Sequence, residues 1–334
     1  MSDDGQVVVV TGAAAGIGRA IARRFASDGA GVALISRNRA GLEGAARDVE
    51  AAGGRALVLP ADVADHEAVE AAAAAAEASL GPIDVWVNDA MATIFAFFED
   101  IEPEEYRRST EVTYLGTVWG TRSALRRMAP RDHGSIVQVG SAMCYRGIPL
   151  QAPYSGAKHA MKGFVDSLRT ELRHKGSKVH VGMVQLPGVN TPQFEHGRSK
   201  MPRHPMPVPP IYEPELAADA VHFCARSRRR ELYVGAPAVY TIWGNKLAPW
   251  LAERYLARTA VDGQMTDEPV ENPRPGNLFD PPGGDEGAHG GFGDRAHERS
   301  LQLSLTKHRR LLGGVAASVA AVTGAAVVGR TRLS

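Results

Sequence analysis

Cysteine is nearly absent from this sequence: Cys144 and Cys224 are the 2 cysteines among 334 residues. Their spacing matches neither a C-x-x-C pair nor a metal-ligand motif, so we expect no disulfide framework, no zinc and no other metal site. An excess of charge is also lacking, since the net charge is +1, and this gives no general attraction to nucleic acid or to an acidic membrane surface. A cleavable apolar leader is missing as well, because the polar start MSDDGQ runs directly into the first apolar segment. We therefore expect a cytoplasmic protein.

Apolar strands alternate with helical segments along most of the chain. With 44% hydrophobic and 22% charged residues, the composition is that of an ordinary globular protein. The expected strands are Gln6–Val10, Val32–Ile35, Arg55–Leu59, Asp84–Val87, the run that ends at Ser141, Val179–Gln185 and Glu231–Val234. Alternation of this kind predicts an α/β fold, with a parallel sheet of about seven strands and helices on both of its faces.

The segment Ser135–Phe164 carries three side chains that can handle protons. Ser141 ends an apolar run typical of a buried strand, and Tyr154 and Lys158 follow in the sequence Y-S-G-A-K. A separation of four residues places the phenol and the ammonium on one face of a helix. A phenol titrates near about 10, and a positive neighbour favours the phenolate, which brings the group closer to the range useful for a general acid or base. The alternative is a surface tyrosine and lysine on an amphipathic helix.

Glycines are concentrated near the N-terminus. There the strand Gln6–Val10 runs into T-G-A-A-A-G-I-G and then into a helical pattern, Arg19–Ser27. Between a strand and a helix, glycines permit a tight turn and let backbone N–H groups approach a pyrophosphate at the helix N-terminus. A glycine triplet alone is weak evidence for a nucleotide site, so its interpretation depends on the other motifs in the chain.

The glycine turn and the set Ser141, Tyr154 and Lys158 together resemble the short-chain dehydrogenase/reductase family, over about residues 6–234. The resemblance implies a Rossmann-like doubly wound sheet that binds a nicotinamide cofactor, with hydride moving between nicotinamide and a carbonyl or secondary alcohol. It assigns Ser141 to the substrate oxygen and Tyr154 to proton transfer, and it has Lys158 hold the ribose and lower the pKa of the tyrosine. In the turn it assigns cofactor contacts to Gly12, Ala14, Gly16, Ile17 and Gly18.

The end of the second strand bears on the choice of cofactor. The family usually has an acidic residue at the position of Ser36 to hold the adenosine ribose, and that acid is missing here. Arg37 instead offers a guanidinium suited to a 2′-phosphate, so the resemblance implies NADP and makes NAD less favoured; the alternative is an incidental surface arginine. Further cofactor contacts are assigned to Asp62, Val63, Asn88, Ala90, Pro187, Gly188 and Thr191, together with Tyr154 and Lys158. Asp62 is equally placed to cap the helix that begins near Asp65.

Three residues depart from the family pattern. Asp89 and Met91 stand in N-D-A-M, where the family normally shows N-N-A-G, and Thr113 replaces an asparagine that commonly helps hold a proton-relay water. A threonine hydroxyl can still donate and accept hydrogen bonds, so Thr113 remains a candidate for the relay. The departures motivate an alternative function, a non-catalytic nucleotide-binding or scaffold protein that retained the fold. The resemblance further implies a homodimer or homotetramer that pairs helices near residues 103–128 and 153–174.

The proline-rich segment Pro192–Tyr212 lacks helical or strand periodicity. In this position the family carries a mobile loop that closes over substrate, and irregular segments of such length are more often functional than accidental. Met201, Met206, Val208 and Ile211 would give the loop an apolar inner face. This composition predicts a lipophilic small-molecule substrate.

The sequence beyond the seventh strand divides into three parts. A helix with Ile242, Trp243, Leu247, Trp250, Leu251 and Tyr255 on an apolar side completes a domain of residues 1–260. Residues 261–300 are rich in proline and glycine, which indicates a linker or an extended arm lying on the domain. Residues 301–334 include an uncharged run of 18 residues, Leu311–Val328, between basic flanks. The run is nearly long enough for a membrane anchor but only weakly hydrophobic, so a helix docked on protein is an equal alternative.

Overall fold

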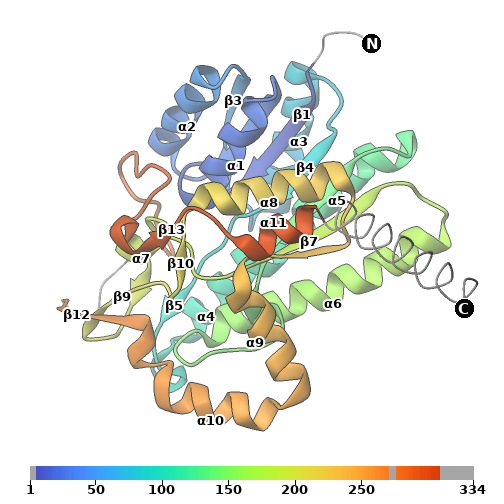
Figure 1. Ribbon diagram of the computed structural model, residues 1–334. Coiled ribbons are helices and arrows are strands. Elements are labelled where there is room, and N and C mark those ends of the chain that lie inside the picture. The colour runs from blue at the N-terminus through green and yellow to red at the C-terminus, as the bar shows by residue number, and fades with distance from the viewer. Residues whose placement is uncertain (1–4, 271–275, 309–334) are drawn as a thin grey trace, which may run out of the picture.

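Seven parallel strands in the order β11-β7-β6-β4-β1-β2-β3 form the sheet at the centre of the fold (Figure 1). The structure is a computed structural model and describes residues 5–270 and 276–308. The strands are β1 (Val7–Thr11), β2 (Gly31–Ser36), β3 (Arg55–Pro60), β4 (Val85–Asn88), β6 (Ser135–Ser141), β7 (His180–Leu186) and β11 (Glu231–Tyr233). Each overlaps one of the strands predicted from the sequence, and the doubly wound parallel sheet is confirmed.

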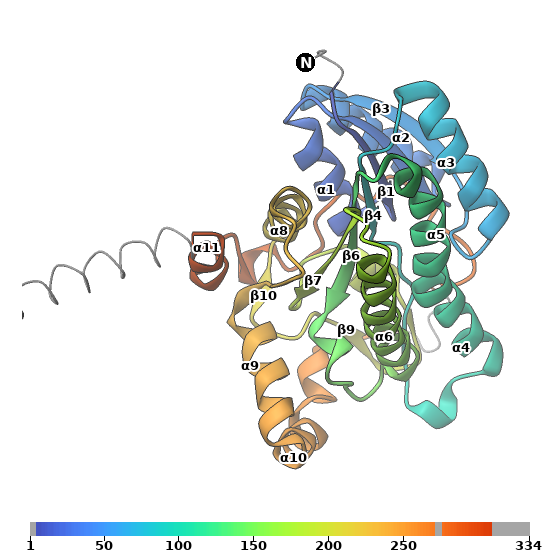
Figure 2. The same ribbon diagram turned by 90° about the vertical axis from the view of Figure 1, so that its right-hand side faces the viewer.

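Two layers of helices cover the sheet, as the turned view shows (Figure 2). One face carries α1 (Gly16–Ala26), α2 (Arg39–Ala51) and α8 (Pro214–Ser227), and the other carries α3 (His66–Leu80), α5 (Gly116–Met128) and α6 (Ala152–His174). Because both faces are covered, the strands are continuous apolar runs rather than alternating ones. The strand β1, for example, has the sequence VVVVT and is buried along its whole length.

The order of the strands reverses beside β1, which pairs with β2 on one side and with β4 on the other. In open α/β sheets a crevice forms at the reversal, beyond the carboxyl ends of the strands, and ligands bind there. Thr11, the last residue of β1, connects the ends of β1 and β4 by hydrogen bonds. Its hydroxyl donates to the Val87 carbonyl at 3.4 Å and accepts from the amides of Asp89 and Ala90 at 3.1 and 3.2 Å. The segment after β4 is therefore fixed next to the glycine turn.

The helix predicted over residues 103–128 is interrupted by a π-helical turn. The helix α4 (Pro103–Thr110) leads into this turn, Glu111–Leu115, and α5 follows directly. Thr113 within the turn hydrogen bonds to both backbone groups of Ala92, which lies in the segment after β4. A π turn widens a helix locally and is frequent at functional sites. Here the widened turn is held against one wall of the crevice.

Short regular elements occupy the segment between β7 and α8, where the sequence predicted none. They are α7 (Gln193–His196), β8 (Arg198–Ser199), β9 (Arg203–Pro205) and β10 (Ile211–Tyr212). Their partners lie elsewhere in the chain, since β5 (Ile94–Phe95) pairs with β8, β12 (Met265–Pro269) with β9, and β13 (Ala296–His297) with β10. Pairing with distant segments leaves no periodicity in the local sequence, which explains why the prediction was wrong.

The apolar helix predicted after β11 is a pair of helices, α9 (Gly235–Leu247) and α10 (Pro249–Thr259). Most of its apolar side is exposed: Ile242 is fully buried, but Trp243 is 50% exposed and Leu247 81% exposed. Within residues 5–270 and 276–308, no helix has both the length and the apolar character needed to cross a membrane. The run Leu311–Val328, for which the sequence allows an anchor, lies outside these described residues.

Residues 276–297, which we call the arm, run back along the domain and end in β13. The helix α11 (Leu301–Lys307) follows and places Leu303, which is 2% exposed, in the same hydrophobic cluster as α1 and α8. The arm makes hydrogen bonds with the glycine turn and with the residues that follow β2. This proline- and glycine-rich segment therefore lies on the domain, close to the crevice.

Candidate active site

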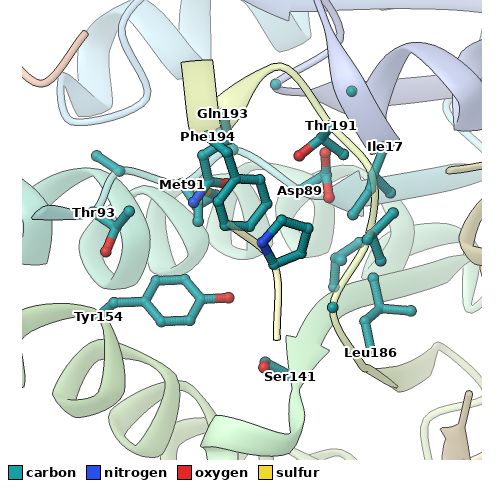
Figure 3. Close-up of a pocket in the computed structure, with 18 of the residues that line it drawn as sticks. Ile17, Asp89, Met91, Thr93, Ser141, Tyr154, Leu186, Thr191, Gln193 and Phe194 are labelled. Atoms are coloured by element: carbon teal, nitrogen blue, oxygen red, sulfur yellow. The ribbon is translucent and has the colours of Figure 1, made fainter. Parts of the chain in front are cut away.

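A cavity of about 400 Å³ opens at the carboxyl ends of the strands. Its wall contains most of the residues that the sequence assigns to a site. These are Gly12, Ala14, Gly16, Ile17, Arg37, Asp62, Val63, Ala90, Ser141, Tyr154, Lys158, Pro187, Gly188 and Thr191. In Figure 3 the side chains of Ile17, Asp89 and Thr191 lie toward one side of the cavity, and the hydroxyl groups of Tyr154 and Ser141 point into it from another.

The glycine turn presents backbone rather than side chains to the cavity. Gly12 has a φ of +73°, and a Cβ at this position would lie 2.9 Å from the backbone of Ala90. The helix α1 starts at Gly16, and the residue before it, Ala15, provides no side chain to cap the first turn. The Gly16 amide donates instead to the Gly287 carbonyl at 3.0 Å, and the Gly18 backbone donates to the Asp89 carboxyl. The helix dipole favours negative charge at this end of the cavity, as a phosphate site requires.

Ser141 and Tyr154 reach the cavity from neighbouring elements, Ser141 at the end of β6 and Tyr154 in the first turn of α6. The Ser141 hydroxyl accepts a hydrogen bond from the amide of Met143 at 3.2 Å, which fixes it at the wall. Burial raises the pKa of the Tyr154 phenol, and the Ser141 hydroxyl beside it acts in the opposite direction. The sequence predicted a lowered pKa for this phenol, and the structure gives the opposite direction because burial disfavours the phenolate. Tyr154 thus keeps its proton at neutral pH.

Lys158 lies one helical turn beyond Tyr154, as the spacing predicted, and is 2% exposed. Its Nζ donates to the Val139 carbonyl at 2.6 Å and lies 5.4 Å from the centroid of the Tyr154 ring. Burial lowers the pKa of the Lys158 ammonium, because the charged form loses hydration. Lys158 also lines the cavity, and an ammonium carries more N–H groups than the bond to Val139 uses. It is therefore placed to bind hydroxyl groups of a ligand.

Arg37 directly follows β2, is half-buried and lines the cavity. Burial lowers the pKa of its guanidinium, and the positive charge of Arg108 acts in the same direction. Arg108 itself donates to Asp62 at 2.5 Å. Two arginines and one carboxylate therefore lie close together where Arg37 and Asp62 line the cavity.

The sequence also allowed Asp62 to cap the helix α3. The N-cap of α3 is Asp65, whose side chain accepts from the first amides of the helix, so this alternative for Asp62 is wrong.

Gly18 and Asn88, both assigned to the cofactor, do not line the cavity. Asn88 is buried, and its side-chain amide donates to Thr121 and Gln138 at 3.1 and 2.9 Å. Gly18 lies under the glycine turn, where a Cβ would collide with the carbonyl oxygen of Gly12. The structure thus gives these two residues a part in the packing beneath the site.

Thr113, the candidate for the proton relay, is fully buried and also lies outside the cavity wall. Its hydroxyl donates to the Ala92 carbonyl and accepts from the Ala92 amide, both at 2.9 Å. A hydroxyl carries a single hydrogen, and Ala92 takes it here. A relay water that accepts a hydrogen bond from Thr113 does not fit this arrangement.

Asp89, the first departure from the family pattern, lines the cavity beside the glycine turn. Burial raises the pKa of its carboxyl to about 7, while the charge of Lys158 and a hydrogen bond from the Gly18 backbone act in the opposite direction. Met91, the second departure, also lines the cavity, as does Phe194 (Figure 3). Asp89 therefore brings a titrating group to the N-terminal end of α1, where the helix dipole favours negative charge.

Replacing Asp89 with Asn should stabilise the protein at alkaline pH. The pKa is about 7 in the fold against 3.8 in the unfolded chain, so the unfolded state loses its proton first and the stability of the parent falls from about pH 4 to about pH 7. We expect Asp89→Asn to exceed the parent by about 1–4 kcal/mol in free energy of unfolding near about pH 8, and by less than about 1 kcal/mol near about pH 4. Urea unfolding at the two pH values measures both. A gap that does not change with pH would contradict the raised pKa.

Several residues of the cavity wall were not predicted from the sequence. Gln151 is 6% exposed, and its side-chain amide donates to Gln264, the residue before β12, at 2.7 Å. The arm contributes Asn277, Pro281, Pro282 and Glu286. Proline and glycine content marked residues 261–300 as unusual, but composition gives a chain segment no position in space.

Comparison with known proteins identifies the family to which this sheet and glycine turn belong. A parallel sheet with a glycine turn at its strand-order reversal is the architecture of dinucleotide-binding enzymes. A family model described as short chain dehydrogenase matches residues 6–202. The uncharacterized oxidoreductase YxnA of Bacillus subtilis is 32% identical over 323 residues, which cover 95% of this chain and 89% of that protein. The chain therefore belongs to the short-chain dehydrogenase family, whose named relatives are oxidoreductases.

Other relatives match a shorter part of the chain. The 3-dehydrosphinganine reductase of Danio rerio is 34% identical over 59% of this chain and 60% of its own length. A solved metagenomic short-chain oxidoreductase in complex with NADP has 30% identity and a TM-score of 0.58, covering 69% of this chain and 97% of its own. A short chain dehydrogenase from Mycobacterium paratuberculosis bound to NAD has 26% identity and a TM-score of 0.60, covering 69% of this chain and 96% of its own. The alignment with YxnA is long enough to extend into the arm.

Proposed function

We propose that this protein is an NADP-dependent oxidoreductase that moves hydride between nicotinamide and a carbonyl or secondary alcohol of a lipophilic small molecule. The observation that carries the proposal is the convergence of Ser141, Tyr154 and Lys158 on a cavity that the glycine turn also lines. A bound nicotinamide supplies the hydride chemistry. The protein supplies placement, hydrogen bonds and a proton.

Each of the three side chains has one task in this proposal. Ser141 donates a hydrogen bond to the substrate oxygen, which becomes more negative as a carbonyl is reduced. Tyr154 holds its proton because burial raises its pKa, and it gives that proton to the same oxygen as a general acid. Lys158 binds ribose hydroxyls with the N–H groups that Val139 does not use. In the oxidative direction the phenol must lose its proton, so alcohol oxidation should be favoured at higher pH.

The preference for NADP over NAD is supported by the last residue of β2, Ser36, and the residue after it, Arg37. Ser36 lines the cavity without the carboxylate that would hold ribose hydroxyls and repel a phosphate. Arg37 follows in the same wall and is suited to a charge-assisted, bidentate bond with phosphate oxygens. One solved relative holds NADP and another holds NAD, so this part of the proposal depends on Arg37.

A lipophilic substrate is supported by the apolar residues of the cavity wall. They include Phe194, Met206, Val208, Tyr240 and Leu256. The apolar inner face predicted for the segment after β7 is present in part, because Met206 and Val208 line the cavity. Met201 and Ile211 are instead 7% and 1% exposed and belong to the protein interior. The remaining wall is still apolar enough to bind an alkyl chain.

A series of methyl ketones and aldehydes of increasing chain length tests this function. Nicotinamide absorbance should fall when NADPH is present, and much more slowly with NADH. Burying one methylene contributes about 0.8 kcal/mol, so kcat/KM should rise about two- to fourfold for each added methylene until the cavity is filled. A kcat/KM that falls with chain length would contradict the lipophilic substrate, and faster turnover with NADH would contradict the choice of NADP.

A further inference from the structure

Three consecutive carbonyl groups of the arm are bound by two arginines of the domain. Arg37 donates to the carbonyl of Phe279 and, at 2.7 Å, to the carbonyl of Asn277. Arg108 donates from Nε to the carbonyl of Leu278, between them, at 3.2 Å. An arginine side chain is long and flexible, and two bonds to one backbone segment order its guanidinium before a ligand arrives. The guanidinium has more N–H groups than these two bonds use.

Side chains of the arm also attach it to the domain near Arg37. Leu278 is fully buried in the hydrophobic cluster that also contains Val63, beside the cavity. Asp285 forms ion pairs with Arg19, which is itself buried, and with Arg47 at 3.3 Å. Unseating the arm would therefore expose a large apolar side chain and leave a buried guanidinium with one fewer partner. These costs keep the arm against the domain.

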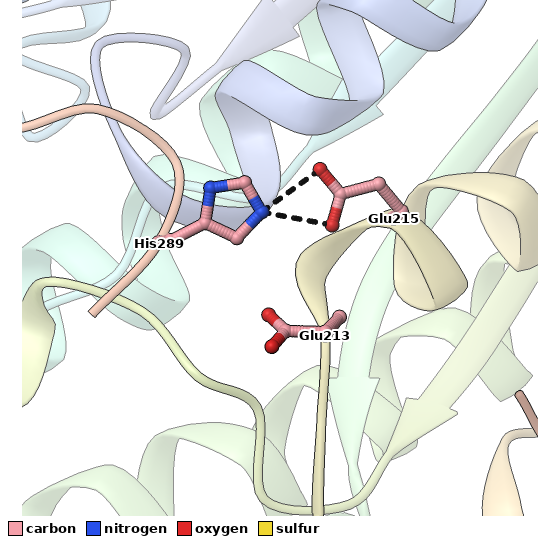
Figure 4. Close-up of side chains that lie close together, drawn as sticks. All are labelled: Glu213, Glu215 and His289. Atoms are coloured by element: carbon pink, nitrogen blue, oxygen red, sulfur yellow. Dashed lines mark hydrogen bonds and ion pairs between the residues drawn. The ribbon is translucent and has the colours of Figure 1, made fainter. Parts of the chain in front are cut away.

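The far part of the arm is fastened to the glycine turn and to α8. The carbonyl of Gly287 accepts a hydrogen bond from the amide of Gly16 at 3.0 Å. His289 pairs with Glu215 at 3.0 Å, and Glu213 lies beside them (Figure 4). We infer that the cluster of His289, Glu213 and Glu215 holds the arm against α8. The arm is thus attached along the stretch that borders the cavity, at Leu278 and Asp285, and again beyond it, at Gly287 and His289.

We propose that the arm positions Arg37 and thereby sets how strongly the enzyme prefers NADP over NAD, an inference that rests on the proposed function. Asn277, Pro281 and Pro282 line the cavity together with Arg37, so the segment that orders the guanidinium also forms the wall next to it. A guanidinium that is already ordered loses less conformational freedom when it binds a phosphate. Affinity for the 2′-phosphate then depends on Leu278, which does not itself line the cavity. Leu278 acts through Arg37 and is a positioning residue.

The test compares Leu278→Ala with the parent in the full chain, with dissociation constants for NADPH and NADH measured by fluorescence titration. NADPH affinity should fall by at least about fivefold more than NADH affinity, the size of a modest coupling between sites. Leu303→Ala is the matched control, because Leu303 is a 2% exposed leucine of α11 that does not line the cavity. It should leave the ratio of the two constants unchanged. Leu278→Met keeps the side-chain volume and should retain the parent ratio.

A double-mutant cycle separates positioning from general loosening of the fold. In an Arg37→Ala background the guanidinium is gone, so Leu278→Ala should no longer change the ratio of NADPH to NADH affinity. A ratio that still falls about fivefold in that background would show that Leu278 does not act through Arg37, and would overturn the proposal.

Hydrogen exchange on the parent provides a test that needs no folded variant. Saturating NADPH should slow amide exchange in residues 276–287 more than saturating NADH does, because only NADPH engages Arg37 through the extra phosphate. Equal protection by both nucleotides overturns the role of the arm, as does a folded Leu278→Ala variant with the parent ratio. A parent that binds both nucleotides equally contradicts the NADP assignment itself, and the inference about the arm falls with it.

Discussion

The Tyr154→Phe variant should turn over carbonyl substrates about 10²–10⁴-fold more slowly than the parent and still bind NADPH with the parent's affinity. The change removes the hydroxyl that points into the cavity and keeps most of the packing of the ring (Figure 3). Because burial holds the phenol in its protonated form, the lost hydroxyl is the lost proton donor. Turnover with the best ketone of the series and a fluorescence titration with NADPH measure the two quantities.

Tyr145→Phe is the matched control for this variant. It removes the same atom, but the Tyr145 hydroxyl donates to Glu231 at 2.6 Å and Tyr145 does not line the cavity. Its turnover should stay close to that of the parent, at some cost in stability because Glu231 loses a hydrogen bond. Parent-like turnover in Tyr154→Phe would remove Tyr154 from the mechanism.

The Arg37→Ala variant should bind NADPH about ten- to a hundredfold more weakly and NADH almost as well as the parent. A hydrogen bond to a charged group contributes roughly 1.5–3 kcal/mol, and the 2′-phosphate that makes this bond is present in NADPH alone. Separate titrations of the apo protein with the two nucleotides measure the effect without any substrate.

Arg39→Ala provides the control for Arg37→Ala. Arg39 lies two positions further along the chain, has a side chain that is 69% exposed, and does not line the cavity. Its removal should change neither dissociation constant. Equal weakening of NADPH and NADH in Arg37→Ala would indicate that the arginine supports the shape of the cavity and does not bind a phosphate.

Local patterns in the sequence predicted the central sheet well. The run VVVVT and its counterparts in the other strands are apolar because both faces of a parallel sheet are buried, and this leaves an unambiguous signal. Gly12 and Gly16 were predicted to form a tight turn, and both have positive φ. The spacing of Tyr154 and Lys158 placed both on one face of α6. In each case the cause lies within a few residues of the effect.

Properties that depend on distant neighbours could not be predicted in this way. Asn88 and Thr113 were assigned to the site from their positions in motifs, but their side chains bond to Gln138 and Ala92, which other elements supply. The direction of the Tyr154 pKa depends on burial by the whole domain, and the sequence shows only the lysine four residues away. A motif therefore locates a residue along the chain without fixing the direction of its side chain.

Two of the departures from the family pattern marked residues of the cavity wall, but they did not predict a loss of the catalytic set. Asp89 and Met91 both line the cavity, so they change the site's surface, whereas the core set of Ser141, Tyr154 and Lys158 is complete there. Membership of the short-chain dehydrogenase family supports an enzyme over the alternative of a non-catalytic scaffold.

Transfer of deuterium from NADPH to a ketone tests the central claim most directly. The parent is incubated with NADPH that carries deuterium at the transferable position of the nicotinamide, and the alcohol product is analysed by mass spectrometry. The account predicts that one deuterium appears on the former carbonyl carbon with the parent, and that its rate of appearance falls by about 10²–10⁴-fold in Tyr154→Phe. NADPH that binds tightly to the parent but transfers no deuterium to any ketone of the series would contradict the account and favour a nucleotide-binding protein without catalysis.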